Sequence, residues 1–242
     1  MENLAERELF TPLREGGSDA SNTERELTSF LRKACQRALD LGAADAIPLS
    51  ATEIVLDERV FLKCLVPVCS FYGRNLMCPP NLMPLSQFRK ILADYSAAIL
   101  IRIENPQGKT TKETGRTGDL SGAWRSADLS INGKAVDQGL DSRYFQALNG
   151  AKEKLLEVIE RTEAMCFQAG YRFAAGFSAG GCVLCDQCVG AGGSQGCRHP
   201  FRARPSMEAM GIDVVATAER VGLELSFGEE TARSWLGLVL VA

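Results

Sequence analysis

The residues of this chain most suited to chemistry are its cysteines, seven of which lie in two short groups. In the downstream group, Cys182, Cys185 and Cys188 form a C-x2-C-x2-C run, and Cys197 follows shortly before a proline. Such a run places three sulfurs on one side of a tight turn, where they can hold three corners of an iron–sulfur cube. A fourth cysteine nearby completes the site. We therefore predict that these four cysteines bind one [4Fe–4S] cluster.

The upstream group consists of Cys64, Cys69 and Cys78, and its C-x4-C-x8-C spacing matches no single cluster signature. It has no fourth cysteine close by in the sequence. We predict that these thiols face the downstream group and either bind a second cluster or help to cover the first. As ligands, three thiolates would leave one iron open to a substrate, a water or a ligand from a partner. In the alternative, one of the three only packs, as free cysteine often does.

Zinc is the main alternative metal, since four thiolates also form a tetrahedral zinc site. Zinc ligands usually come as two C-x2-C pairs, whereas three of these cysteines share one run, which favours a cube. Cys35 and Cys166 stand alone in expected helices and are interpreted as small core residues. His199, the single histidine, is interpreted as a group behind the ligands or on the surface.

Glycines and arginines surround the downstream cysteines. The glycines let backbone N–H groups approach the sulfurs of an anionic cluster, because glycine has no Cβ. The arginines either offset the cluster charge or form a docking face for an acidic redox partner protein, and ordinary solvation explains them as well. The segment from Arg204 to Asp213 is expected to support the site, with Glu208 and Asp213 capping helix N-termini. A rival interpretation makes Glu208 a general acid beside an open iron.

The composition is that of an ordinary globular protein, with 45% hydrophobic and 24% charged residues. A net charge of −3 argues against a nucleic-acid-binding surface, which needs a concentrated basic patch. No apolar run approaches the roughly 20 residues that span a bilayer, and the acidic N-terminus lacks the apolar core of a signal peptide. We therefore expect a cytoplasmic protein without a membrane or nucleic-acid partner, in which clustered thiols serve metal or redox chemistry. The oligomeric state is left open.

The elements that must position the cysteines follow from hydrophobic periodicity and from turn residues. The expected helices are 23–41, with a capping box at Thr23, and 84–95, 141–169 and 213–221. The expected strands are a hairpin over 53–64 and single strands at 98–103, 171–177, 223–227 and 235–241. This alternation indicates an α+β fold, with a mixed β-sheet flanked by helices and a cysteine-rich metal-binding loop region.

The domain organisation follows from the same pattern. Residues 1–22 mix charge, glycine and serine without a period and are expected to be a mobile N-terminal tail. Residues 23–242 are expected to form a single cysteine-rich metal-binding domain. Within it, residues 105–140 are rich in glycine, serine, threonine and charge, which predicts a loop-like insertion.

Several motifs together resemble those of a known family. They are Lys63-Cys64, Cys69, Tyr72-Gly73-Arg74, Cys78-Pro79-Pro80, the Cys182, Cys185 and Cys188 run, Cys197-Arg198-His199-Pro200, and residues 204–214. On these features the chain resembles the predicted metal-binding proteins of domain of unknown function 2284, found mainly in anaerobic bacteria and archaea. The resemblance implies that both cysteine groups belong to the family's metal-binding design, and it supplies no reaction.

Three function classes follow. The first, which we expect, is an iron–sulfur protein that acts as an electron-transfer or redox accessory protein of anaerobic metabolism. The absence of a nucleotide-binding motif and of paired catalytic groups favours it. The alternatives are an enzyme with an open-iron cluster site and a zinc-binding structural or interaction module.

Overall fold

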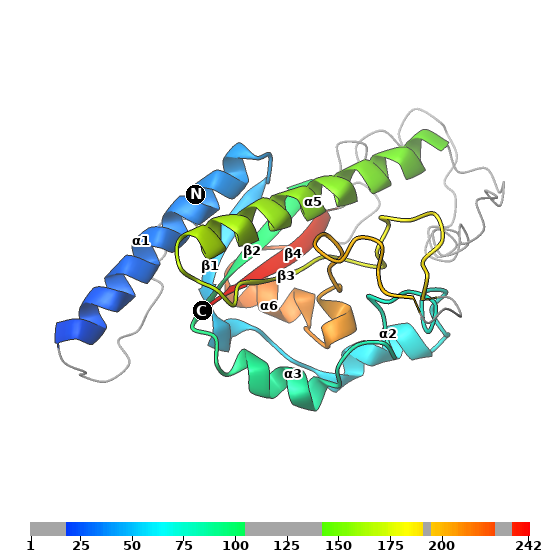
Figure 1. The fold of residues 1–242 in the computed structure, drawn as a ribbon, viewed down its shortest axis with the longest axis horizontal. Coiled ribbons are helices and arrows are strands. Elements are labelled where there is room, and N and C mark those ends of the chain that lie inside the picture. The colour runs from blue at the N-terminus through cyan, green and yellow to red at the C-terminus, as the bar shows by residue number, and fades with distance from the viewer. Residues whose placement is uncertain (1–17, 105–141, 191–194, 226–233) are drawn as a thin grey trace.

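In the computed structural model, the described residues are 18–104, 142–190, 195–225 and 234–242 (Figure 1). Their centre is a four-stranded sheet of β1 (Asp45–Ser50), β2 (Ala97–Glu104), β4 (Ser234–Val241) and β3 (Ala175–Phe177), in that spatial order. The α+β class is confirmed. All pairings among these strands are antiparallel, so the sheet is not mixed in direction. The strands β2 and β3 run the same way, but β4 inserts between them and no parallel pair forms.

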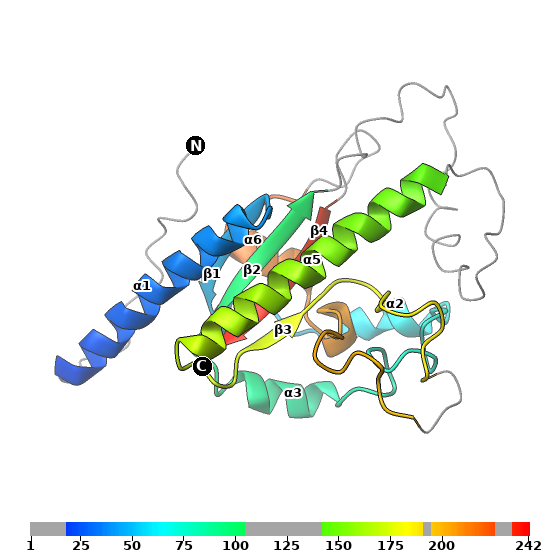
Figure 2. The ribbon, with the colours of Figure 1, turned by 45° about the horizontal axis from the view of Figure 1, so that its top comes forward.

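Helices cover both faces of the sheet (Figures 1 and 2). They are α1 (Ser18–Asp40) and α5 (Ser142–Gln168) on one face, and α3 (Leu85–Leu92) and α6 (Val214–Arg220) on the other. Side chains alternate along β2, so that Ile99 and Ile101 face α1 and α5 while Leu100 faces α3 and α6. Burial on both faces explains why the central strands are continuous apolar runs.

The long periodic elements are confirmed. The helices expected at 84–95, 141–169 and 213–221 correspond to α3, α5 and α6, and the strands at 98–103 and 235–241 correspond to β2 and β4. The carboxylate of Asp213 caps α6 as expected, accepting the backbone N–H of Ala216 at 3.0 Å. Gly42, Gly170 and Gly222 follow α1, α5 and α6 with positive φ, as helix-ending glycines do.

Three local expectations are wrong. The helix expected at 23–41 is present as α1, but it begins at Ser18, so Thr23 lies inside the helix and is not its cap. The hairpin over 53–64 is absent. The chain there forms the 3-10 turns η2 (Ala51–Glu53) and η3 (Glu58–Phe61) and then α2 (Leu62–Leu65), because Ser50 and Asp57 cap the two turns with their side chains. Residues 223–225 are not a strand, and 226–227 lie outside the described residues.

Two strands differ from the expectation in extent. Of residues 171–177 only the last three form β3. The strand β1 was not predicted, because it is short and contains Pro48, which weakens a strand signal. Among the described strands it pairs with β2 alone and lies at the edge of the sheet, where proline is tolerated.

Residues 105–140, the expected insertion, lie outside the described residues, as does most of the expected tail. Across the ranges given above, no helix is long and apolar enough to cross a membrane.

Candidate metal centre

The two cysteine groups lie against each other although they are far apart in the sequence. α2 carries Cys64, and the chain then turns through Cys69 to Cys78 before it enters α3. The strand β3 ends at Phe177 and leads into the loop that carries Cys182, Cys185 and Cys188. Figure 2 shows this yellow loop passing beside the cyan segment around α2. The amide of Asn75 joins the two by donating to the backbone oxygen of Cys182 at 3.1 Å, across 107 residues of sequence.

Two glycines allow this close approach. A Cβ on Gly181 would lie 2.8 Å from carbon atoms of the Phe71 ring. A Cβ on Gly190 would lie 2.9 Å from the backbone nitrogen of Leu76 and 3.2 Å from the backbone oxygen of Arg74. Real Cβ atoms do not approach other atoms so closely, and the neighbours of Gly190 are backbone atoms that cannot rotate away. Glycine at these positions therefore lets the upstream turn pack directly on the downstream loop.

Backbone donors reach two of the downstream sulfurs. The N–H of Leu76 donates to Sγ of Cys188 at 3.5 Å, so an upstream residue supports a downstream thiol. The N–H of His199 donates to Sγ of Cys197 at 3.3 Å. Peptide N–H groups aimed at sulfur stabilise thiolates and tune the metal centres that they hold. The backbone of His199 thus lies next to a candidate ligand.

The arginines after the downstream group hold the fold together. The guanidinium of Arg198 donates to the backbone oxygen of Gln187 at 3.0 Å and so ties the two ends of the cysteine loop. Arg202 pairs with Glu160 at 3.3 Å. Arg204 pairs with Glu163 at 2.6 Å, and both of these side chains are largely buried. Arg204 therefore fixes the chain after the cysteine loop through a carboxylate on α5.

Burial and mutual repulsion raise the pKa values of three candidate ligands, Cys64, Cys78 and Cys182. Burial raises the pKa of Cys78 to about 12, and the charges of Cys69 and Cys64 add to the shift. Burial also raises the pKa of Cys182, with contributions from Cys197 and Cys185. Cys182 further contributes to the shift at Cys78, so these two thiols link the two groups electrostatically. A bound metal cation reverses this preference, because only the thiolate coordinates.

Lys152 on α5 lies within reach of both cysteine groups and was not predicted from the sequence. Its side chain is 6% exposed, its ammonium donates to the backbone oxygen of Gly181, and Nζ lies 5.4 Å from the ring centroid of Trp235. Burial lowers the pKa of Lys152, while Cys182, Glu208 and Cys78 oppose that shift. The signal was present in the sequence, since Lys152 precedes the buried Leu155 and Leu156 by one helical turn.

The residues present fit an anionic thiolate–metal centre. The nine cysteines are free thiols, and Cys35 and Cys166 are fully buried core residues as expected, which leaves the seven others as donors. Backbone donors, closely packed glycines and a buried ammonium surround these thiols. As they stand, no three cysteine, histidine or acidic side chains of the described residues are gathered closely enough to hold a metal ion. Binding of a metal ion on either cysteine group would bring the sulfurs of that group closer together.

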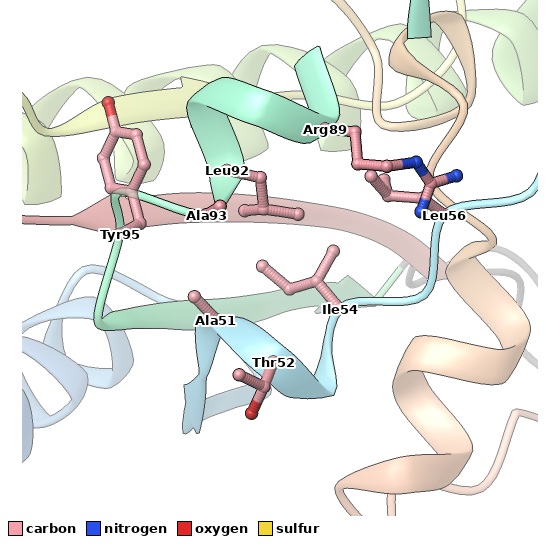
Figure 3. Close-up of a pocket in the computed structure, with 8 residues that line it drawn as sticks. All are labelled: Ala51, Thr52, Ile54, Leu56, Arg89, Leu92, Ala93 and Tyr95. Carbon is pink, nitrogen blue, oxygen red and sulfur yellow. The ribbon is translucent and has the colours of Figure 1, made fainter. Parts of the chain in front are cut away.

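A separate pocket of about 210 Å³ lies between η2 and the C-terminal end of α3 (Figure 3). Its walls are mainly apolar. Ile54 and Leu92 face each other across it, and Arg89 and Tyr95 lie toward opposite ends. None of its lining residues is a cysteine, a histidine or an acid. The pocket therefore offers neither metal ligands nor an acid–base pair, and the chemistry of the described residues is concentrated at the cysteine loops.

One comparison with known proteins identifies the family. The model of the family described as "Predicted metal-binding protein (DUF2284)" matches residues 47–241, which is most of the chain. The chain therefore belongs to this family, and the resemblance suggested by the cysteine motifs is confirmed. No curated protein and no solved structure matches the chain. The family supports metal binding and leaves the metal and the reaction to be proposed.

Proposed function

We propose that this metal-binding protein holds a [4Fe–4S] cluster on Cys182, Cys185, Cys188 and Cys197 and acts as an electron-transfer or redox accessory protein. One observation carries the proposal. The upstream turn packs on the cysteine loop at Gly190 and donates the N–H of Leu76 to Cys188. Backbone N–H groups around the thiolates stabilise an anionic cluster. The C-x2-C-x2-C run can bind three corners of an iron–sulfur cube.

The surrounding residues have distinct roles in this proposal. A bound cluster supplies a one-electron redox centre. The ammonium of Lys152 offsets part of its negative charge, and the backbone N–H groups of Leu76 and His199 stabilise the thiolates. Phe71, packed on Gly181, shields the loop on the side of the upstream turn. These groups hold the ligands and set the charge around them.

The surface beside the upstream cysteines supports a redox partner protein. Four apolar side chains around Cys64 and Cys69 are exposed, namely Leu62, Leu65, Val66 and Val68, by 55%, 42%, 72% and 69%. Exposed apolar patches of this kind mark contact surfaces. Electron transfer requires a partner to approach the metal centre closely, and this patch lies directly beside two candidate ligands. We propose that the partner contacts it, in the reducing environment of the cytoplasm.

Anaerobic purification followed by assay of iron and acid-labile sulfide tests the proposal. We expect iron and sulfide in the chain, and an electron paramagnetic resonance signal after reduction with dithionite. Cys188→Ser should lose most of the iron, whereas the matched control Cys166→Ser should retain it, because Cys166 lies in the core away from the loops. A colourless protein with stoichiometric zinc and no sulfide would show that the chain is a zinc-binding module instead.

A further inference from the structure

The upstream group lacks one ligand for a four-coordinate metal. Cys64, Cys69 and Cys78 lie on one folded segment, in which the N–H of Cys69 donates to the backbone oxygen of Cys64 at 3.0 Å. The N–H of Gly73 donates to the backbone oxygen of Pro79 at 2.9 Å, which folds the rest of the segment back on itself. Four donors complete a tetrahedral zinc site or the corners of a cube. A site closed by the protein alone therefore needs a fourth donor from elsewhere in the chain.

Glu208 has the chemistry and the environment of such a donor. Its Oε2 is buried and has no hydrogen-bond partner among the described residues. A buried carboxylate oxygen without a partner is costly, because it has lost its hydration without compensation. The expectation that Glu208 caps a helix is wrong. The turn η6 (Glu208–Met210) follows Met207 without a side-chain cap, and Ser206 accepts the N–H of Ala209 instead.

The backbone holds Glu208 beside the upstream group. η6 packs against η3, which leads directly into α2 and Cys64. The N–H of Asp57 donates to the backbone oxygen of Gly211 at 3.0 Å, and the N–H of Asp213 donates to that of Val55 at 2.8 Å. Figure 2 shows the orange segment that contains η6 next to α2. Backbone hydrogen bonds therefore fix the turn that contains Glu208 to the segment that precedes Cys64.

The carboxylate of Glu208 lies within electrostatic reach of the Cys64 thiol and of the buried Lys152 ammonium. No ion pair joins Glu208 to Lys152 in the described part of the chain, so the carboxylate oxygen remains available.

We propose that Glu208 becomes the fourth ligand of a metal site with Cys64, Cys69 and Cys78 when a metal ion draws these four side chains together, since they are not gathered closely enough to hold one as they stand. This inference rests on the proposed function, since it adds a second metal to a chain that already binds one at the downstream group. Zinc accepts thiolate and carboxylate ligands together. Coordination would satisfy the buried oxygen and close the position that three cysteines alone leave open. The upstream site is then a closed site rather than a place for substrate.

Anaerobic titration of the reduced, metal-free full chain with cobalt(II) tests the inference, because cobalt reports thiolate ligands through its absorption spectrum. We expect the wild-type chain to bind about two cobalt ions, one for each ligand set of four. Glu208→Gln should lose one of them, and Cys188→Ser should lose the other. Glu219→Gln is the matched control, since Glu219 is an exposed acid on α6 and should not affect binding.

Glu208→Cys separates ligation from a purely structural role. If residue 208 is a ligand, this variant binds both ions with a stronger sulfur-to-cobalt absorption, because its upstream site has four thiolates. A Glu208→Gln variant that binds cobalt with the wild-type stoichiometry, affinity and spectrum would overturn the inference while leaving the proposed function intact. A wild-type chain that takes up neither cobalt nor iron would overturn both. A Glu208→Cys variant with the stoichiometry of Glu208→Gln would also remove residue 208 from the ligand set.

Discussion

Replacing Gly190 with alanine tests whether contact between the two cysteine groups is needed for metal binding. The new Cβ would lie 2.9 Å from the backbone nitrogen of Leu76, and ordinary contact begins at 3.4 Å. The upstream turn must therefore move away by about 0.5 Å (3.4 − 2.9), which weakens the N–H···S bond from Leu76 to Cys188. Overpacking of this size costs about 1–3 kcal/mol. If this free energy is lost from metal binding, the affinity of the chain for the metal falls by roughly 5–150-fold.

The assay is competition for the bound metal by a chelator of known affinity, under anaerobic conditions and with the full chain. Gly196→Ala is the matched control, because it lies in the same loop and its Cβ would meet nothing within 4 Å. We expect Gly196→Ala to bind metal as the wild-type chain does. Equal affinities for Gly190→Ala and Gly196→Ala would refute the reasoning, since the contact between the loops would then not contribute to the metal centre.

Two further predictions concern charged side chains. Lys152→Met should lower the midpoint potential of the metal centre in a redox titration, because a nearby ammonium favours the more negative reduced state. Lys152→Arg keeps the positive charge and should keep most of the potential. An unchanged midpoint potential in Lys152→Met would contradict the role of the charge. Arg204→Met should lower the free energy of unfolding in urea by about 1.5–3 kcal/mol, because Glu163 loses a largely buried partner. Arg202→Met, which breaks an exposed pair, should cost only about 0–1 kcal/mol; equal losses in the two variants would contradict the difference in burial.

The parts of the fold that could be predicted are those with long hydrophobic periodicity. Residues 84–95 and 141–169 carry their pattern over several helical turns, and both became helices. The stretch 53–64 was misjudged because its β-branched residues suggest strands, whereas the caps at Ser50 and Asp57 decide its local structure. A single capping residue is a weaker sequence signal than the strand propensity of several β-branched residues. In this chain the caps nevertheless fix the backbone that leads to Cys64.

The candidate site was predictable in its residue types but not in its arrangement. The spacing divided seven cysteines into an upstream group of three and a downstream group of four, and the motifs led to the right family. The contact between Asn75 and Cys182 could not be foreseen, because it depends on how β3 and α2 are placed by the sheet and its helices. Glu208 was expected to cap a helix, and only the structure shows that its Oε2 is buried with no hydrogen-bond partner in the part of the chain that is described.

Lys152 is a buried ammonium within electrostatic reach of both cysteine groups, and its charge suits an anionic centre there. Removing an ammonium from water costs several kcal/mol unless negative charge compensates it. The direct contacts of Lys152 among the described residues are a backbone oxygen at Gly181 and the face of Trp235, and neither carries a full charge. The groups that oppose the lowering of its pKa are Cys182, Glu208 and Cys78, and the two cysteines compensate it only as thiolates. Burial disfavours the thiolate form at Cys78 and Cys182, and Glu208 supplies a full negative charge in its place. A metal cation bound by the sulfurs would stabilise the thiolates, and a centre that stays net negative would add to the charge that compensates Lys152.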